Sequence, residues 1–173
     1  MVFLEAEVLT IARTNKGDAI FIKPLKRDKF VPIFIRPVES QAILFALSNI
    51  PSARPLTHDL LIDIINKLRA VVERIEIPYL KDQTFYSRII LRQGMRKIQI
   101  DARPSDSLNI AHRCGCPLFI AESIVETVGV PLSFLAERQE EEEKATLQQQ
   151  LKRAIASENY EEAARIRDKL NSL

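Results

Sequence analysis

One sequence pattern occurs twice in this chain at an offset of 67 residues, and it constrains the fold more than any other feature. The pattern Arg-Pro-x-acid-Ser-x-x-Ile occupies residues 36–43 and again residues 103–110. The same offset aligns residues 19–35 with residues 86–102, and both segments have the pattern of two short strands joined by a turn. A repeat at a fixed offset indicates that one unit of strand hairpin and helix is used twice, so we expect approximate internal two-fold symmetry.

The length and composition of the chain limit its class. A chain of 173 residues can form one domain with a proper core and a small appendage, and 46% apolar with 28% charged residues is typical of a globular protein. No apolar run approaches the roughly 18 residues that span a bilayer, and the N-terminus lacks the pattern of a signal peptide. Cys114 and Cys116 are poorly placed for a structural disulfide. We therefore expect a cytoplasmic protein that does not contact a membrane.

The remaining patterns predict an α+β fold of layered sheets and helices. Alternating apolar residues predict strands at 3–11, 19–25, 30–35, 71–78, 84–91, 97–101 and 118–120. Helical spacing of apolar residues predicts helices that start near Pro37, Thr57, Pro104 and Ala121. Thr57 is expected to be an N-cap, and Gly115 is expected to end the third helix.

The C-terminal part differs from the rest in composition and charge. Residues 1–135 hold 18 Lys and Arg against 14 Asp and Glu, whereas residues 136–173 hold 7 against 9. We expect an α+β domain at 1–135, a charged linker at 136–146 and an antiparallel helical hairpin at 147–173. Such a hairpin buries little surface alone, so it is expected to pack against another copy or a partner protein.

The two repeated motifs place an arginine and an acid at each strand-to-helix junction. If the prolines occupy the first helical position, Glu39 and Asp106 fall at the third, where an acid caps the backbone of the residue before the proline. Alternatively, Arg36 and Arg103 at the helix N-termini form a site for an anion such as a phosphate. Asp101 adds a carboxylate at the second junction alone, which suggests that the second repeat has more of any activity.

A second polar cluster lies at residues 54–63. His58 could move a proton or bind a metal, because histidine changes its charge near neutral pH. Asp59 and Asp63 lie on one helix face and could share a divalent cation, or Asp59 could simply stabilise the helix dipole. Lys81 and Asp82 form a third polar element or an ordinary turn.

Two other kinds of site are excluded. His112, Cys114 and Cys116 lack the second ligand cluster and the spacing of a structural zinc site, and a helix end explains them. Four glycines in the whole chain are too few for a dinucleotide fingerprint, and no phosphate loop or nucleophile elbow is present in the sequence.

Three sequence blocks resemble the bifunctional nuclease (BFN) domain family. They are Arg-Pro-Leu-Thr-His-Asp-Leu at 54–60, Leu-Lys-Asp-Gln-Thr-Phe-Tyr at 80–86 and Ile-Asp-Ala-Arg-Pro-Ser-Asp-Ser at 100–107. The resemblance covers roughly residues 1–130 and implies an α+β domain that cleaves DNA and RNA and forms homo-oligomers. The chain departs from the family at Arg36, where glycine is usual, so a close approach of ligand or subunit at that position is in question.

The C-terminal residues have a resemblance of their own. Leu-Lys-Arg-Ala at 151–154 and the segment 158–170 are similar to the UVR motif of the B and C subunits of the bacterial nucleotide-excision nuclease. This motif mediates contacts between proteins. The resemblance therefore implies a bacterial chain whose residues 147–173 bind a protein partner.

These features together favour a nuclease that hydrolyses phosphodiester bonds of DNA or RNA with the help of Mg²⁺ or Mn²⁺. The expected metal ligands are Asp59, Asp101 and Asp106. The expected phosphate-binding residues are Arg36, Arg54, Lys81 and Arg103. The expected catalytic residues are His58, Asp59, Arg103 and Asp106, with Arg103 on the scissile phosphate and His58 moving a proton or orienting water.

Two other functions fit the same sequence. The chain could be a non-catalytic oligomeric adaptor whose C-terminal hairpin recruits a DNA-repair or stress-response partner. It could also be a regulatory module that binds a small anionic ligand at the paired arginine junctions, which stabilisation by nucleotides rather than oligonucleotides would indicate.

Overall fold

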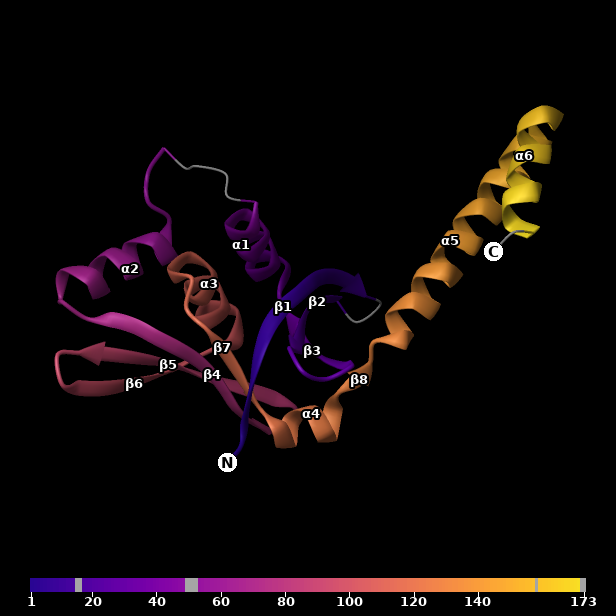
Figure 1. The fold of residues 1–173 in the computed structure, drawn as a ribbon. Helices are drawn as coiled ribbons and strands as arrows, with labels where there is room; N and C mark the ends of the chain where they lie inside the picture. Colours follow the sequence, from indigo (N-terminus) through magenta and orange to yellow (C-terminus); the bar gives the residue numbers. More distant parts are fainter. Residues whose placement is uncertain (15–16, 49–52, 158, 172–173) are drawn as a thin grey trace. The chain divides into compact units, whose positions relative to one another are not determined.

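A computed structural model describes residues 1–14, 17–48, 53–157 and 159–171 of the chain (Figure 1). The chain divides into two units, Met1–Val130 and Pro131–Leu173. The first unit is an α+β domain and the second is a pair of helices, so the expected fold class is confirmed.

The first unit is built on an eight-stranded sheet with the strand order β6-β5-β4-β7-β1-β2-β3-β8. The pair β4–β7 is parallel, and the hairpins on both sides of it are antiparallel. The strands are β1 (Phe3–Thr14), β2 (Gly17–Pro24), β3 (Lys29–Ile35), β4 (Val71–Lys81), β5 (Thr84–Gln93), β6 (Arg96–Ala102), β7 (Leu118–Ala121) and β8 (Val130–Pro131).

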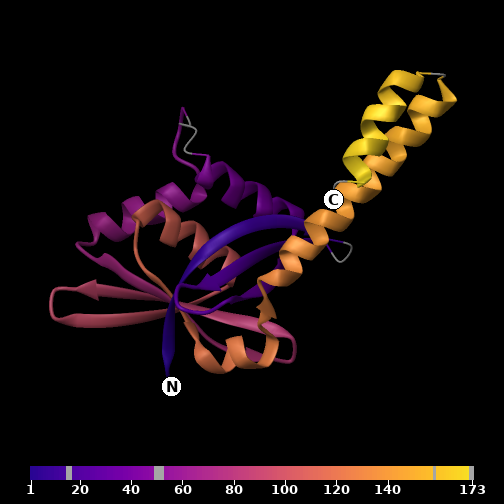
Figure 2. The ribbon, with the colours of Figure 1, turned by 45° about the vertical axis from the view of Figure 1, so that its right-hand side comes forward.

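Four helices belong to this unit. Three of them lie together on one side of the sheet, and the fourth lies apart from them beside β7 (Figures 1 and 2). The helices are α1 (Pro37–Leu47), α2 (Thr57–Lys67), α3 (Pro104–Cys114) and α4 (Glu122–Val128). Because α3 contacts both α1 and α2, the starts of the three helices can contribute to one surface.

The internal repeat is visible in the element order and is longer than the sequence motif. The unit β1-β2-β3-α1 is followed by β4-β5-β6-α3, since the offset of 67 residues moves β1 onto residues 70–81. The residues before the two helices have almost the same backbone angles, φ −80° and ψ 153° at Arg36 and φ −74° and ψ 148° at Arg103. A proline follows each of them at the first helical position, as expected.

The core lies between the sheet and the helices and consists mainly of β-branched side chains. Isoleucines of the central strands are fully buried, and each contributes about 1.5–3 kcal/mol relative to an exposed position. These residues are Ile20, Ile22, Ile75, Ile77 and Ile120. Their alternation fixes the strand register, because a shift by one residue would turn them to the opposite face.

Helix α2 leaves most of its apolar stripe in solvent. Leu60, Ile64 and Leu68 are 53%, 45% and 61% exposed, although Ile65 packs against the core. The helix begins one residue earlier than expected: Leu56, not Thr57, is the N-cap, since its N–H donates to Asp59 Oδ2 at 2.8 Å, and Thr57 is the first helical residue. The exposed stripe is a candidate contact surface.

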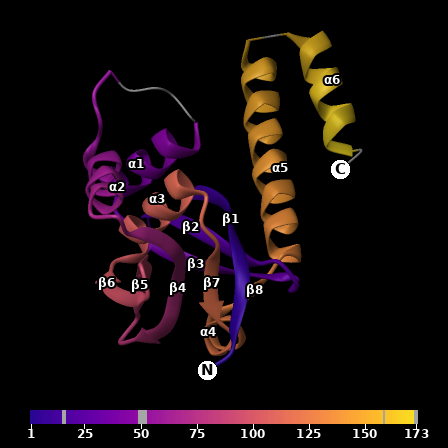
Figure 3. The same cartoon turned by 60° about the vertical axis from the view of Figure 1, so that its left-hand side comes forward.

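The second unit is an antiparallel hairpin of α5 (Ser133–Ala156) and α6 (Tyr160–Asn171), shown in Figure 3. Its small core joins Leu147, Ala154, Ala163 and Ile166. The segment 136–146 continues as helix within α5, so the first helix of the hairpin is longer than the three turns expected from the sequence.

Candidate functional site

The first helix of the repeat begins with a closed arginine–acid pair. Glu39 Oε2 accepts a hydrogen bond from the backbone N–H of Arg36 at 3.0 Å, which is the expected capping contact. The guanidinium of Arg36 donates to Glu39 Oε1 through Nε at 3.1 Å and Nη2 at 2.8 Å. Glu39 therefore caps the helix and also holds the guanidinium of Arg36 at the start of α1.

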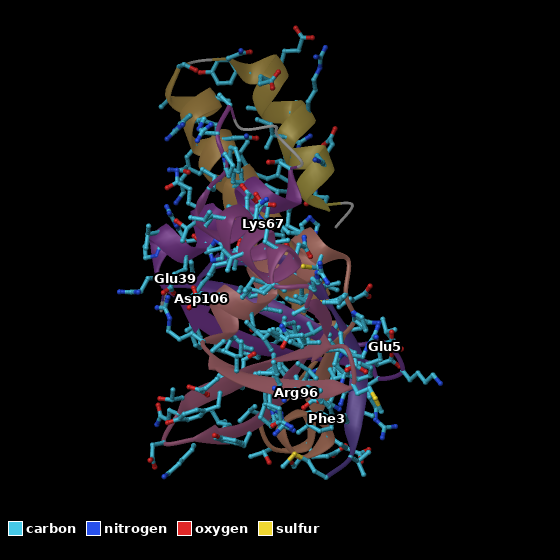
Figure 4. The ribbon with its side chains drawn as sticks, turned by 90° about the vertical axis from the view of Figure 1, so that its left-hand side faces the viewer. Phe3, Glu5, Glu39, Lys67, Arg96 and Asp106 are labelled. Carbon is cyan, nitrogen blue, oxygen red and sulfur yellow. The ribbon has the colours of Figure 1, made fainter. Side chains whose placement is uncertain are left out.

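Arg103 joins the two repeats. Its Nε and Nη2 donate to Asp106 Oδ2 and Oδ1 at 2.9 and 3.1 Å, and its Nη1 donates to Glu39 Oε1 at 2.5 Å. Glu39 and Asp106 lie beside one another in Figure 4, at the starts of α1 and α3. One guanidinium thus lies between the equivalent acids of both repeats. Phosphate binding by Arg36 and Arg103 stays a prediction.

Helix α2 adds His58 to this group. Its Nε2 lies 3.7 Å from Asp106 Oδ1, and its side chain is only 16% exposed. We call Arg36, Glu39, His58, Arg103 and Asp106 the junction cluster. The cluster combines two arginines that can bind a phosphate with a histidine–carboxylate contact that can handle a proton.

Asp59 lies next to the junction cluster in sequence but belongs to a different network. It caps the backbone at Leu56 and accepts a hydrogen bond from Arg113 Nε at 2.7 Å. Arg113 also donates through Nη1 to Asn109 Oδ1 at 2.7 Å. These contacts fasten α2 to α3, and they position His58 against Asp106.

The charges of the site are stabilised by these contacts. Burial raises the pKa of Glu39, but hydrogen bonds from Arg36 and the charge of Arg103 outweigh this effect and hold that pKa below its usual range. The capping hydrogen bond from Leu56, together with Arg113, lowers the pKa of Asp59. Hydrogen bonds to Asp106 and the charge of Glu39 raise the pKa of Arg103. Glu39 and Asp59 are therefore carboxylates at neutral pH.

Buried hydroxyl groups attach both helix starts to the sheet. Ser40 donates a hydrogen bond to Asp18 of β2, which lowers the pKa of that carboxyl group. Ser107, the repeat equivalent of Ser40, lies with its Oγ 2.6 Å from Ser87 Oγ of β5. The serine of the repeated motif thus fixes where the arginine and the acid of each junction lie.

Other residues expected to act at the site are outside the hydrogen bonds and ion pairs that join the junction cluster. Asp101 is on β6 opposite Arg88, where it lines a separate cavity. Arg54 is exposed in the segment before α2, and Lys81 is the exposed last residue of β4. Asp82 and Gln83 form the two-residue turn after it with φ of 48° and 60°, which is the ordinary reading of that element.

The expected metal ligands do not form a cluster of their own. Within the described ranges, no group of three or more His, Cys, Asp or Glu side chains is placed to hold a metal ion. Asp59 is bound to Arg113, Asp106 is bound to Arg103, and Asp101 faces the cavity near Arg88. The identity of a cation as Mg²⁺ or Mn²⁺ stays a prediction.

Arg113 and Asn109 are site-supporting residues that the sequence did not identify. Basic residues at a helix end are explained by the helix dipole, so Arg113 had no distinguishing pattern. Its spacing of four residues from Asn109 was the available signal, because residues at this spacing share a helix face.

The fold and the junction cluster define a duplicated α+β domain with a charged site at two equivalent helix starts. A family model described as the bifunctional nuclease domain matches residues 20–133. The chain therefore belongs to the bifunctional nuclease domain family. A second model, described as the UvrB/uvrC motif, matches residues 141–173, which confirms the resemblance noted for the C-terminal hairpin.

Several named proteins are similar to this chain. An uncharacterized protein of Mycobacterium tuberculosis is 33% identical over 122 residues, which cover 70% of this chain and 73% of the relative. The bifunctional nuclease 1 of Oryza sativa subsp. indica is 28% identical over 60% of this chain and 32% of the relative. The bifunctional nuclease 1 of Arabidopsis thaliana is 23% identical over 81% of this chain and 51% of the relative. The chain thus spans between a third and a half of these two plant proteins.

Among the residues that the structure describes, no helix combines the length and the apolar character needed to cross a bilayer.

Proposed function

We propose that this protein is a nuclease that hydrolyses phosphodiester bonds of DNA or RNA and that the junction cluster is its active site. The position of Arg103 supports this proposal most, since it contacts Glu39 and Asp106 across both repeats and is 55% exposed. A guanidinium held in this way keeps its orientation while its outer face stays accessible to a phosphate. The family membership of the chain supports the same reaction class.

The residues of the cluster have different roles in this reaction. Arg103 and Arg36 bind the oxygens of the scissile phosphate and stabilise the negative charge that increases when water attacks phosphorus. His58 orients that water and accepts its proton, and Asp106 stabilises the imidazolium that results. The ester P–O bond breaks as the bond from water forms, and the leaving oxygen takes a proton from solvent. Asp59 acts indirectly, because its contact with Arg113 holds the start of α2 in place.

A divalent cation fits this site only together with the substrate. The described carboxylates provide no protein-only cage, but Mg²⁺ is commonly held by one or two carboxylates and substrate phosphates, with water completing its shell. Asp106 is the expected metal ligand that contacts Arg103, and Asp59 and Asp101 stay secondary candidates. When bound, the cation would neutralise charge on the phosphate.

Hydrolysis of labelled single-stranded DNA and RNA tests the proposal. Wild-type protein should cleave in the presence of Mg²⁺ and cleave less after a chelator removes it. His58→Ala and Asp106→Ala should each lose activity in the presence of Mg²⁺. Asp28→Ala is the matched control, because Asp28 is an exposed acid in the turn between β2 and β3. Equal cleavage by all four proteins would remove the junction cluster from the mechanism.

We also propose that the α5–α6 hairpin binds a partner protein. Among the described residues its core has four buried side chains, and Ile155 and Tyr160 are 52% and 69% exposed. A hairpin with so little buried surface gains stability when a partner covers it. This observation favours, as second candidate function, an adaptor that recruits a repair or stress-response protein.

Deletion of residues 136–173 separates the two functions. A nuclease whose hairpin only docks should keep its turnover on simple substrates after the deletion and lose its partner. An adaptor should have no turnover before or after the deletion, and it should lose the same partner.

Self-association and cellular location are further parts of the proposal. The exposed stripe of Leu60, Ile64 and Leu68 supports formation of a homo-oligomer, since apolar patches of this kind are typical of contacts between proteins. Light scattering would measure the molar mass in solution, and the Leu60→Asp and Ile64→Asp variants should have a lower mass than wild type. A cytoplasmic location stays a prediction.

A further inference from the structure

Two tyrosines form an aromatic pair on the strands of the second repeat. Tyr79 of β4 lies opposite Tyr86 of β5, with ring centroids 4.8 Å apart and ring planes at 30°. The strand register shifts between Glu76 and Tyr79, and Pro78 lies within this irregular segment. Such bulges redirect side chains and are frequent beside functional sites. Tyr79 remains 45% exposed, so one aromatic surface is open to a ligand.

The tyrosine pair lines a small cavity with a polar wall. The cavity has a volume of about 240 Å³, and Arg88, Gln99 and Asp101 lie around it with the two tyrosines. Pockets for drug-sized ligands measure roughly 300–1,000 Å³, so this one suits a single planar ring system. Its wall has the guanidinium of Arg88 as donor, the carboxylate of Asp101 as acceptor and the amide of Gln99, which can donate and accept. This set matches the edge of a nucleobase, which has both donors and acceptors.

The charge of the wall argues against a phosphate in this cavity. Arg88 already donates to Glu76 Oε2 at 2.5 Å and to Gln99 Oε1 at 3.4 Å. One arginine therefore accompanies two acids here, Glu76, which is 3% exposed, and Asp101. The junction cluster instead has two arginines for two acids. A neutral aromatic ligand with polar edges is therefore a better match than an anion.

The first repeat has neither the tyrosine pair nor the polar wall at the equivalent positions. Residues 67 positions earlier than Tyr79 and Tyr86 are Ala12 and Ala19, which also pair across two strands. The equivalents of Arg88, Gln99 and Asp101 are Phe21, Pro32 and Phe34. Duplication alone would leave the two repeats alike, so the tyrosine pair and the polar wall are specific to the second repeat.

The cavity lies close to the junction cluster along β6. Asp101 and Arg103 are separated by one residue in extended backbone, which corresponds to roughly 7 Å between their Cα atoms. A chain with a phosphate at Arg103 can therefore extend toward the tyrosine pair.

We propose that this cavity is a base-binding subsite for single-stranded nucleic acid. The inference rests on the proposed function, because the phosphate of the same strand occupies the junction cluster. A base stacks on Tyr79, and its edge binds the wall formed by Arg88, Gln99 and Asp101. Only a single strand exposes both faces of a base, so the subsite selects single-stranded over double-stranded substrate.

Fluorescence anisotropy with the full chain tests the subsite. The probes are a short single-stranded oligonucleotide, the same length of abasic backbone, and the duplex form. Wild type should bind the oligonucleotide more tightly than the other two probes. Tyr79→Ala should weaken binding of the oligonucleotide roughly tenfold and leave abasic binding unchanged, as is usual for loss of one stacking contact. Tyr79→Phe should keep the wild-type affinity.

Tyr160→Ala is the matched control, because Tyr160 is 69% exposed on α6 and lies outside the first unit. Equal affinity of wild type for the oligonucleotide and the abasic backbone would overturn the subsite, and so would an unchanged Tyr79→Ala variant with wild-type thermal unfolding. Tyr79→Ala binding that falls equally for all probes would indicate a contact with something other than bases.

The two proposals fail separately. Arg103→Ala should weaken the oligonucleotide and the abasic backbone by the same factor. A base preference that depends on Tyr79 while Arg103→Ala has no effect would support the cavity as a base site and contradict the junction cluster. If Arg103→Ala loses affinity for both the oligonucleotide and the abasic backbone, and wild type shows no preference for bases, the result would support the junction cluster and contradict the base site.

Discussion

Arg36 and Arg103 occupy equivalent positions in the two repeats but have different contacts. Arg36 binds Glu39 alone, whereas Arg103 binds both Asp106 and Glu39. Arg103 is therefore held by two carboxylates, and its orientation depends on both repeats. Arg36 provides an internal control for any effect of removing a guanidinium at this surface.

Arg103→Ala should lower kcat/KM for phosphodiester cleavage on the order of 100-fold, as removal of one preorganised donor to a transition-state oxygen does. Arg36→Ala should cause a smaller loss. Steady-state kinetics on a labelled oligonucleotide measures both. Equal losses in the two variants would show that the contact across the repeats has no role in catalysis.

Glu76 makes the stability of the domain depend on pH. Burial raises the pKa of Glu76, but hydrogen bonds from Arg74 Nε at 2.7 Å and from Arg88 outweigh burial, so its folded pKa lies below the unfolded value of about 4.3. A group of this kind stabilises the fold above its unfolded pKa, and the stabilisation is lost as pH falls through the folded pKa.

Glu76→Gln should lower the free energy of unfolding at about pH 7 by roughly 3 kcal/mol, because it removes one partner of a mostly buried ion pair. The difference from wild type should shrink as the pH falls below about 4. Urea unfolding over this pH range measures it. Glu73→Gln is the control, since Glu73 is exposed on the same strand. A difference that stays constant with pH would contradict the role of the charge.

At the scale of elements, one buried hydroxyl pair attaches α3 to β5. Ser87 and Ser107 are 1% and 0% exposed, and their Oγ atoms lie 2.6 Å apart. Removing one hydroxyl leaves the other buried without this hydrogen-bond partner, which is unfavourable. Removing both hydroxyls leaves neither group unsatisfied in this contact.

Ser107→Ala should therefore cost about 1–3 kcal/mol of unfolding free energy. The double variant with Ser87→Ala should cost clearly less than the sum of the two single variants. Ser48→Ala, at the exposed C-cap of α1, should stay within about 0.5 kcal/mol of wild type. Strict additivity in urea unfolding would show that the two hydroxyls do not interact.

The elements of the first unit could be predicted from sequence because their signals are local. Strand alternation and the prolines at 37 and 104 predicted the hairpins and the starts of α1 and α3 within a few residues. The start of α2 was misplaced by one residue, because Asp59 reaches the backbone of Leu56. A carboxylate in the first turn can cap the backbone N–H of either of two neighbouring residues, and the sequence does not show which of them is the N-cap.

The site could be predicted only in part, because its contacts are of two kinds. The pair Arg103–Asp106 spans three residues and follows from helix geometry. The contacts of Arg103 with Glu39 and of Arg113 with Asp59 span 64 and 54 residues, and they depend on how α1, α2 and α3 pack. Tyr79 and Tyr86 were not identified, although comparison with Ala12 and Ala19 at the repeat offset contained the signal.

At the scale of the whole molecule, the two units have separate cores. A protein that ends at residue 135 should therefore unfold within about 4 °C of the first transition of the full chain, since such a shift corresponds to roughly 1 kcal/mol. Differential scanning calorimetry measures both proteins. A much lower Tm of the shortened protein would show that the hairpin stabilises the α+β domain.

The position of β1 in the sheet determines when folding can finish. Residues Phe3–Ala6 pair with Leu118–Ala121 in the middle of the sheet, not at its edge. On the ribosome, this inner strand must wait on the order of ten seconds for its neighbour to be synthesised. Until then β2 covers only one edge of β1, and the edge that will bind β7 exposes unpaired backbone groups of the nascent chain.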